Sequence, residues 1–250
     1  MLFATSVAGR FALEALAFGQ GEVCAVFRRS FYLRIEDERG VSHFTCVGDT
    51  SLGHGPLNAL VPGLELPAIG AKISVATRGA RLWEPPAHAG KPPDLEALKA
   101  AASGRVPEEG LGCLILGSHN ALSGYAHPAL EALERWLVGN ALAGEAELLI
   151  GLGPGLTPLG DDYLGGMLLA LRTSGRGVQA DALWRWLQPR LTARTSAISA
   201  AHLAAAASGQ AHEALHEVLN GELGLDKLDA VGHCSGWDGL AGALAVFETY

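Results

Sequence analysis

One segment combines glycine, hydroxyl and carboxylate residues at a spacing suited to binding a small anion. It spans residues 151–166 and reads GLGPGLTPLGDDYLGG. Thr157-Pro158 predicts a helix start, with a hydroxyl N-cap and proline at the first helical position. Glycines leave backbone N–H groups uncovered, and the positive end of a helix dipole attracts anions. The residues expected to bind the anion are Gly151, Gly153, Gly155, Thr157 and Gly160.

Two adjacent carboxylates, Asp161 and Asp162, follow this loop. Acidic residues in a first helical turn interact favourably with the dipole of any helix, and this role would account for one of them. The pair could also orient a substrate amide or hold a cation such as Mg²⁺. The loop does not fit a nucleotide motif, because Asp161 replaces the Walker lysine and Leu156 occupies a required glycine of the dinucleotide pattern. We predict that both acids are catalytic without a bound metal, with magnesium at the pair as the alternative.

A second glycine-rich segment spans residues 232–239 and reads GHCSGWDG. It resembles a nucleophile elbow with Cys234 at its centre, but a hydrolase of that kind needs a histidine after the nucleophile, and none follows here. We instead predict a second helix start, capped by Ser235. The residues expected to complete the site are His233 and Asp238 as catalytic groups, with Ser235 and Gly236 binding substrate. A packed, locally hydrogen-bonded histidine is the structural alternative for His233.

A third pattern, His212-Glu213-Ala214-Leu215-His216, is a literal H-E-x-x-H sequence. On a helix it would present two imidazoles one turn apart, as zinc requires, with Glu213 beside a bound water. The glycine and third histidine of the extended motif are missing. We therefore predict a solvated helix with both histidines on a polar shoulder, and keep a zinc-dependent hydrolase as the alternative.

Composition and charge exclude several classes of protein. The 250 residues are 49% apolar and 18% charged, which excludes a disordered chain, and 33 glycines are an excess that must have a local cause. A net charge of -8 without a basic cluster argues against nucleic-acid binding. The sequence lacks an apolar run long enough to span a membrane. Four widely separated cysteines favour reduced thiols, so we expect a cytoplasmic protein without membrane contact.

The elements that position these segments change in type along the chain. Short β-branched and aromatic runs predict strands near residues 23–27, 31–35, 42–47, 72–77 and 80–83, with a hairpin tip at Asp37–Gly40. Residues 48–63 are expected to be irregular, and 148–150 to form a short strand. After the proline-rich stretch, periodicity near 3.6 predicts helices. They are expected at 129–143, 158–172, 180–191, 195–207, 211–219 and 237–247.

These elements predict an α+β protein, with a small N-terminal β-barrel or sandwich followed by a mainly α-helical domain. We expect a β-rich domain over residues 1–85, a linker with a short helix over 86–110, and the helical domain over 111–250. Both glycine-rich helix starts fall in the last of these. Ten of the 33 glycines lie in residues 151–166 and 232–242, which gives the glycine excess a location.

Three segments together resemble a known family. GLGPGLTPLGDDYLGGMLLAL, TSAISAAHLAAAASGQ and VGHCSGWDGLAG occur in the order found in a bacterial family associated with the AllH-like subunit of oxamate carbamoyltransferase. The resemblance is strong over residues 148–247 and diffuse over the β-rich third. Leu159 and Cys234 stand where the family usually has serine, which puts in doubt a side-chain hydroxyl role at these two positions.

The resemblance implies a share in a multi-subunit enzyme of purine-nitrogen catabolism. That enzyme exchanges a carbamoyl group between oxalurate and phosphate, giving oxamate and carbamoyl phosphate. The expected partners are therefore a small anionic metabolite and the other carbamoyltransferase subunits. Two glycine-lined helix starts suit this chemistry, because their N–H groups could bind small anions and a tetrahedral oxyanion. A non-catalytic anion-binding or assembly subunit is the alternative.

Overall fold

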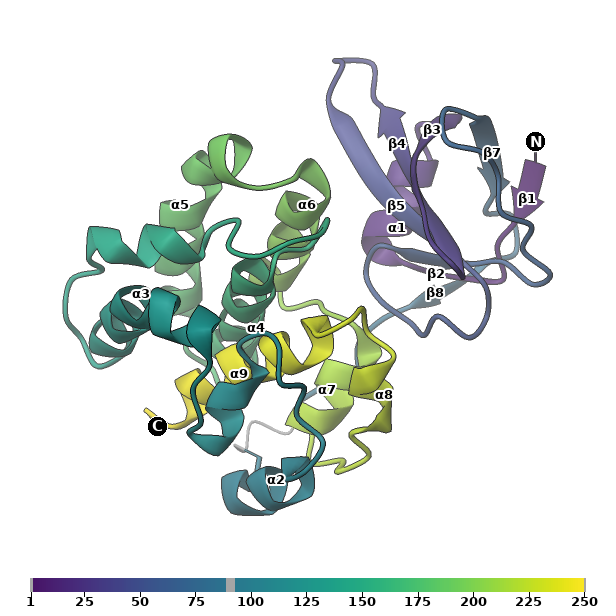
Figure 1. Ribbon diagram of the computed structural model, residues 1–250. Helices are drawn as coiled ribbons and strands as arrows, with labels where there is room; N and C mark the ends of the chain where they lie inside the picture. Colours follow the sequence, from purple (N-terminus) through teal and green to yellow (C-terminus); the bar gives the residue numbers. More distant parts are fainter. Residues whose placement is uncertain (1, 89–92, 250) are drawn as a thin grey trace. The chain divides into compact units, whose positions relative to one another are not determined.

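The computed structural model describes residues 2–88 and 93–249, and the chain divides into two compact units, Met1–Pro85 and Pro86–Tyr250. The first unit is a sheet with one helix, and the second is helical (Figure 1). Each unit has its own buried apolar cluster. The α+β prediction, with a β-rich N-terminal part and a helical C-terminal part, is therefore confirmed.

The first unit is a curled half-barrel sheet of eight strands among the described residues, in the order β1-β7-β3-β4-β5-β6-β2-β8. Antiparallel pairs dominate its middle, whereas β1 pairs with β7 and β2 with β8 in parallel. The strands are β1 (Leu2–Ala4), β2 (Val7–Gly9), β3 (Gly21–Val26), β4 (Ser30–Glu36), β5 (Ser42–Gly48), β6 (Asn58–Leu60), β7 (Lys72–Ala76) and β8 (Arg81–Trp83).

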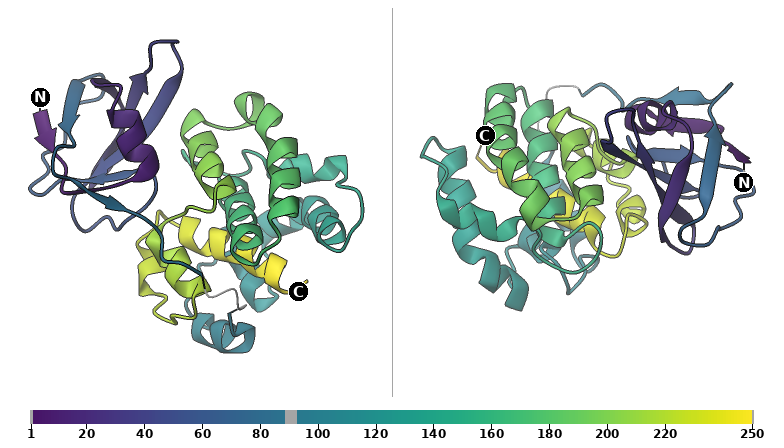
Figure 2. Two further views of the ribbon diagram at one scale, coloured as in Figure 1. Left: turned by 180° about the vertical axis from the view of Figure 1, so that it is seen from behind. Right: turned by 90° about the horizontal axis from the view of Figure 1, so that it is seen from above.

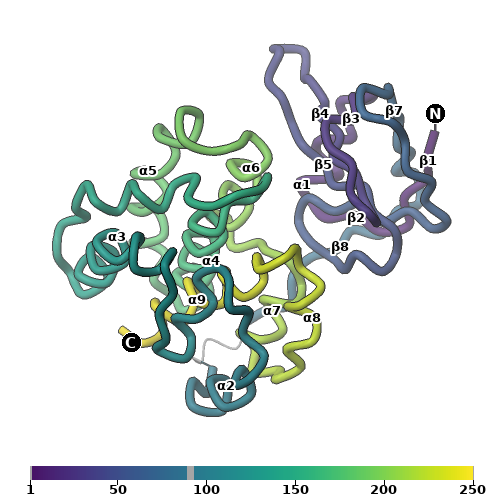
Figure 3. Tube along the Cα trace, in the orientation of Figure 1, coloured from purple at the N-terminus to yellow at the C-terminus, as the bar shows by residue number. Residues whose placement is uncertain are grey.

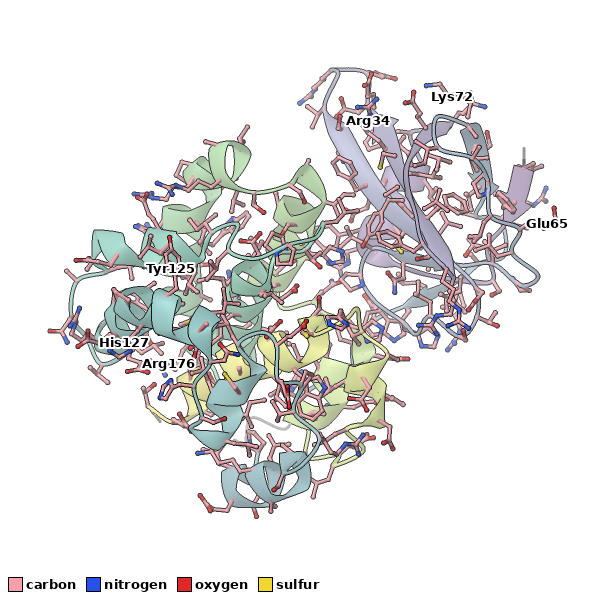
Figure 4. All side chains as sticks on the ribbon, viewed as in Figure 1. Arg34, Glu65, Lys72, Tyr125, His127 and Arg176 are labelled. Atoms are coloured by element: carbon pink, nitrogen blue, oxygen red, sulfur yellow. The ribbon has the colours of Figure 1, made fainter. Side chains whose placement is uncertain are left out.

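Alternating apolar residues build the core of this sheet. Phe31, Leu33 and Ile35 on β4 are fully buried, as the period-two pattern predicts. Helix α1 (Arg10–Leu16) packs on β5 and covers the concave side of the sheet (Figure 2). Arg34 and Lys72 on β4 and β7 flank Glu22 and form ion pairs with it (Figure 4).

The predicted hairpin tip at Asp37–Gly40 is confirmed. The Asp37 carboxylate accepts hydrogen bonds from the N–H groups of Arg39 and Val41, both at 2.9 Å, and Gly40 has φ 76°. The prediction that residues 48–63 are irregular is wrong at β6. This strand has three consecutive buried residues, because it lies between β5 and β2, and it therefore lacks the alternation that reveals a strand.

The second unit contains nine helical segments among its described residues besides α8 (Asp226–Asp229), a single turn before the last helix. The segments are α2 (Leu95–Ala102), η1 (Gly112–Leu116), α3 (Ala121–Leu137), η2 (Gly144–Leu149), α4 (Leu159–Thr173), α5 (Gly177–Arg194), α6 (Ala197–Ala207), α7 (Glu213–Leu219) and α9 (Ser235–Phe247).

The largest differences from the sequence prediction in this unit concern α3, predicted over 129–143, and residues 148–150. Helix α3 begins at Ala121 rather than at 129, because Asn120 caps it in a capping box with Ser123 and Pro128 is accommodated inside the helix. The predicted strand at 148–150 is wrong, since Leu148 and Leu149 end the 3₁₀ helix η2. A three-residue apolar run does not distinguish a strand from a tight helical turn.

Helices α4 and α9 pack against each other more extensively than any other pair of elements (Figure 1). A Cβ atom on Gly166 would overlap the backbone oxygen of Gly239, and one on Gly242 would overlap that of Tyr163. These glycines therefore bring the two backbones into direct contact. Helices α5 and α6 both pack on α4 and on each other, as the path of the chain shows (Figure 3).

Arg176 joins the C-terminal ends of α3 and α9. Its guanidinium donates hydrogen bonds to the backbone oxygens of Leu137, at the end of α3, and Val246, at the end of α9 (Figure 4). Among the helices of the described residues, none has both the length and the apolar character needed to cross a membrane.

Candidate functional site

The first glycine segment forms an irregular loop that leads into α4. Gly151, Gly153 and Gly155 all have positive φ, at 75°, 105° and 99°, a conformation that favours glycine at each position. A Cβ on Gly151 would overlap the backbone oxygen of Arg194, whereas Gly155 is exposed and has open space around it. Within the described residues, the N–H groups of Gly153 and Gly155 donate no hydrogen bond. The loop therefore presents uncovered donors.

Thr157 does not cap α4, so that part of the sequence prediction is wrong. The N-cap residue is Pro158, and the N–H groups of Asp161 and Asp162 both bond to its backbone oxygen. The chain folds back at Gly160, whose N–H bonds to the oxygen of Leu152, and this moves the helix start one residue later. The Thr157 hydroxyl instead lies 3.4 Å from the Ser235 hydroxyl.

Asp161 is buried in a complete set of hydrogen bonds. Its Oδ1 accepts from the Gly151 N–H at 2.8 Å, and its Oδ2 accepts from the hydroxyls of Thr195 and Ser199. Burial raises the pKa of Asp161, and these three donors partly oppose that shift. The carboxyl group thus joins the glycine loop to the start of α6.

Asp162 faces the second helix start. The neighbouring Ser235 hydroxyl favours its ionised form, and its buried Oδ2 has no hydrogen-bond partner among the described residues. Burial raises the pKa of Asp162 well above its usual range, and the charges of Asp238 and Asp161 raise it further. Asp162 therefore retains its proton to higher pH than an ordinary carboxyl group.

Asp238 is fully buried near the start of α9. Its Oδ1 accepts hydrogen bonds from the backbone N–H groups of Leu111, at 2.6 Å, and Gly112, at 3.0 Å, whereas its Oδ2 has no partner among the described residues. Burial raises the pKa of Asp238 to about 7, against the opposing effect of the two N–H donors. Gly110 has φ 86°, and a Cβ there would lie 2.5 Å from Oδ1, so only glycine allows this close approach.

Ser235 is the first residue of α9 and not its cap, which corrects the sequence prediction. Cys234 occupies the N-cap position and makes no capping hydrogen bond. Gly236 serves packing, because a Cβ there would lie 2.5 Å from the Leu228 oxygen. The Ser235 hydroxyl reaches Thr157 and Asp162 instead. The two glycine segments, distant in sequence, therefore meet through a group we call the helix-start cluster: Thr157, Asp162, Ser235 and Asp238.

His233 lies apart from this cluster. Its imidazole is exposed, and its Nε2 lies 2.9 Å from Oε2 of Glu109. Next to it, Cys234 is buried, and its pKa is raised to about 11 by burial and by the negative charges of Asp238, Glu109 and Asp162. Cys234 is thus a protonated thiol at neutral pH, unlike the thiolate that a nucleophile elbow needs.

The sequence was compared with models of known protein families. Residues 149–247 match the AllH family model, which is described as oxamate carbamoyltransferase subunit AllH. Over these residues the chain is similar to the AllH family. The match confirms the resemblance inferred from the three sequence segments. Searches of curated proteins and of solved structures found no match.

The AllH segment, residues 149–247, extends from the glycine loop to the end of α9 and so contains every member of the helix-start cluster. It carries the family signature of a subunit of oxamate carbamoyltransferase. The sheet and the segments α2, η1 and α3 lie outside the match. Whether the predicted site residues bind substrate stays a prediction, as does magnesium at Asp161 and Asp162.

The H-E-x-x-H sequence of the AllH segment does not form the expected exposed pair. His212 is the N-cap of α7, and its Nδ1 accepts a hydrogen bond from the Ala214 N–H. His216 is fully buried, with Nε2 accepting from the Ala211 N–H and Nδ1 2.8 Å from Nε2 of His88. Burial lowers the pKa of His216 to about 3. The prediction of a polar shoulder is wrong for His216, because its ring nitrogens are satisfied locally and it can therefore be buried.

Sequence patterns did not reveal the contributions of Glu109 or of the backbone N–H groups of Leu111 and Gly112. Glu109 gives no motif signal, since it stands in a short acidic stretch between Pro107 and Gly110. The backbone donors of Leu111 and Gly112 cannot be read from residue types at all. Ser196 caps α6, with its hydroxyl accepting a hydrogen bond from the Ser199 N–H.

Proposed function

We propose that this chain is a subunit of an oxamate carbamoyltransferase and that its helix-start cluster binds the small anionic substrate. The observation that supports this most directly is the AllH match over residues 149–247, which contain both helix starts. The contact between Thr157 and Ser235 supports a single shared site, because it joins the two segments.

The reaction suits uncovered backbone donors. Phosphate attacks the carbamoyl carbon of oxalurate, a tetrahedral oxyanion forms, and the oxamate nitrogen leaves as carbamoyl phosphate is released. The N–H groups of Gly153 and Gly155 donate no hydrogen bond to any described residue, so they are available for an anionic oxygen. Gly151 differs from them, because its N–H is already bound to Asp161.

Carboxyl groups beside an anion site would repel the substrate if they were ionised. The raised pKa values of Asp162 and Asp238 reduce that repulsion, since both groups hold a proton to higher pH than usual. A protonated Asp162 could also give its proton to the departing oxamate nitrogen. Ser235 lies beside Asp162 and is positioned to orient it.

The test is phosphate-dependent cleavage of oxalurate by this chain together with its partner subunits. We expect Asp162→Asn to lower kcat by about 100-fold or more, because a general acid usually contributes that much. Asp226→Asn is the matched control, since Asp226 is an exposed aspartate that pairs with Arg105, and it should leave the rate unchanged. Full activity of the Asp162 variant would remove this residue from the mechanism.

The non-catalytic alternative makes a different prediction. An anion-binding or assembly subunit would bind oxamate or carbamoyl phosphate at equilibrium, but Asp162→Asn would leave the turnover of the assembled enzyme intact. Calorimetry on the chain alone, followed by activity of the reconstituted complex, separates the two. Binding without any dependence of turnover on the cluster would favour the assembly role.

A further inference from the structure

We propose that Glu109, His233 and Cys234 form a binding site for a transition-metal ion of the zinc type. One ligand atom from each residue is available, namely a carboxylate oxygen, an imidazole nitrogen and a thiol sulfur. All three atoms lie within 4.8 Å of one another. This is the only such group of three potential ligands among the residues that the structure describes.

The spacing is close to what a tetrahedral ion requires. Zinc binds sulfur at about 2.3 Å and nitrogen or oxygen at about 2.0–2.2 Å, which places ligand atoms roughly 3.3–3.8 Å apart. Glu109 and His233 are exposed side chains, 78% and 84% accessible, so rotamer changes can bring their atoms inward. Cys234 is buried and fixed at the start of α9, and it would anchor the ion.

The scaffold that holds the ligands together is buried and specific. Glu109 lies on the segment before η1, whereas His233 and Cys234 lie before α9. Asp238, on the first turns of α9, binds the N–H groups of Leu111 and Gly112 and thereby fixes the first segment to the second. The two sides of the site are therefore joined by a buried carboxyl group and not by surface contacts alone.

The chemistry of the ligands selects the type of ion. A thiolate with an imidazole and a carboxylate suits zinc or cobalt, whereas magnesium and calcium take oxygen ligands. The Cys234 thiol would release its proton to solvent when the sulfur binds the ion.

Three protein ligands leave a fourth position, and the exposure of Glu109 and His233 places that position in contact with solvent. Open three-ligand sites are typical of zinc ions that bind water or a ligand, whereas closed structural sites use four protein ligands. The site is distinct from the H-E-x-x-H sequence, whose His212 caps α7 and whose His216 is buried.

The experiment is a titration of the chelator-treated, full-length chain with Co²⁺, followed by displacement with Zn²⁺. A cobalt–thiolate bond gives a charge-transfer band in the near ultraviolet, which reports on Cys234 directly. We expect one equivalent of cobalt to produce this band and zinc to abolish it. Cys234→Ser should eliminate the band, and His233→Gln should weaken the affinity by about ten-fold or more.

Matched controls exclude other sites. Cys24→Ser removes the exposed cysteine, and His212→Asn removes the first imidazole of the H-E-x-x-H sequence while keeping a good N-cap; both should retain the band. His233 is exposed, so its variant is expected to fold, and circular dichroism checks this. The proposal would be overturned if the wild type gave no cobalt band. It would also be overturned if the His233 and Cys234 variants bound cobalt with the affinity of the wild type.

Discussion

Asp161 and Asp162 are neighbours in sequence but occupy different environments. Asp161 accepts three hydrogen bonds and joins the glycine loop to α6, whereas Asp162 faces Ser235 and has a buried oxygen with no partner in the described part of the chain. The sequence suggested the same role for both acids, because adjacent carboxylates at a helix start look equivalent. Their environments indicate a structural role for Asp161 and a chemical one for Asp162.

We expect Asp161→Ala to lower the free energy of unfolding by about 2–4 kcal/mol, because the Gly151 N–H and two hydroxyls lose their buried acceptor. Asp162→Asn keeps the size of the side chain and should change stability by less than about 1 kcal/mol. Urea unfolding followed by circular dichroism measures both. Equal destabilisation of the two variants would contradict the division of roles.

Asp238 predicts a pH dependence of stability. Its folded pKa of about 7 lies above the ordinary value of 3.8, so the folded state binds a proton that the unfolded state has released. The stabilisation from this group is present below pH 3.8 and declines as the pH rises to about 7. The free energy of unfolding should fall by up to about 1.4 kcal/mol per pH unit in that window.

Asp238→Asn should flatten this dependence. The amide oxygen can still accept from Leu111 and Gly112, and no proton is taken up on folding. Denaturant unfolding at several pH values, with a chelator present, compares the variant with the wild type. An unchanged slope between pH 4 and 7 would show that Asp238 does not titrate as inferred.

At the level of elements, the contact of α4 with α9 holds the two helix starts in place. The period-3.6 pattern predicted both helices, and their observed bounds differ from the expected ones by only one or two residues. The pattern could not reveal that they pack against each other, because Gly166 and Gly242 contribute no apolar side chain to a helical stripe. Their partner across the contact is backbone, which has no sequence signature.

A matched pair of glycine substitutions tests this contact. Gly166→Ala would place a Cβ against the Gly239 oxygen and should destabilise the protein by on the order of 3 kcal/mol or more. Gly165→Ala is the control, because its Cβ would meet only side chains at 3.9 Å and alanine favours a helix. Thermal unfolding should show a large loss for the first and a small gain for the second.

At the scale of the whole molecule, the two units have separate cores. Sequence periodicity predicted the change from sheet to helices near residue 85, but not the short strands β1, β2 and β6 or helix α1. Those elements are too short for a periodic pattern to emerge, and their pairing partners are distant in sequence. The helix-start cluster was predicted by residue type, whereas its internal geometry depends on backbone contacts that residue types do not encode.

The AllH segment is smaller than the unit that contains it. Leu98 of α2, Ile115 of η1 and Leu133 of α3 are buried in the same core as α4 and α9, yet they precede residue 149. We expect a fragment of residues 86–250 to fold cooperatively, whereas residues 149–247 alone should not, because they leave this core incomplete. Denaturant unfolding of both fragments measures this, and a cooperative transition of the shorter one would contradict it.

The contact between α4 and α9 also has an evolutionary consequence. Most packed residues can change in concert, with a larger side chain on one side offset by a smaller one on the other. The three atoms nearest to a Cβ on Gly166 all belong to the Gly239 backbone, so a replacement of a side chain on α9 cannot make room there. Correlated substitutions among related sequences should therefore not reveal the contact between α4 and α9. In related sequences we expect this contact to appear as two fixed glycines, at the positions of Gly166 and Gly242, and not as a covarying pair.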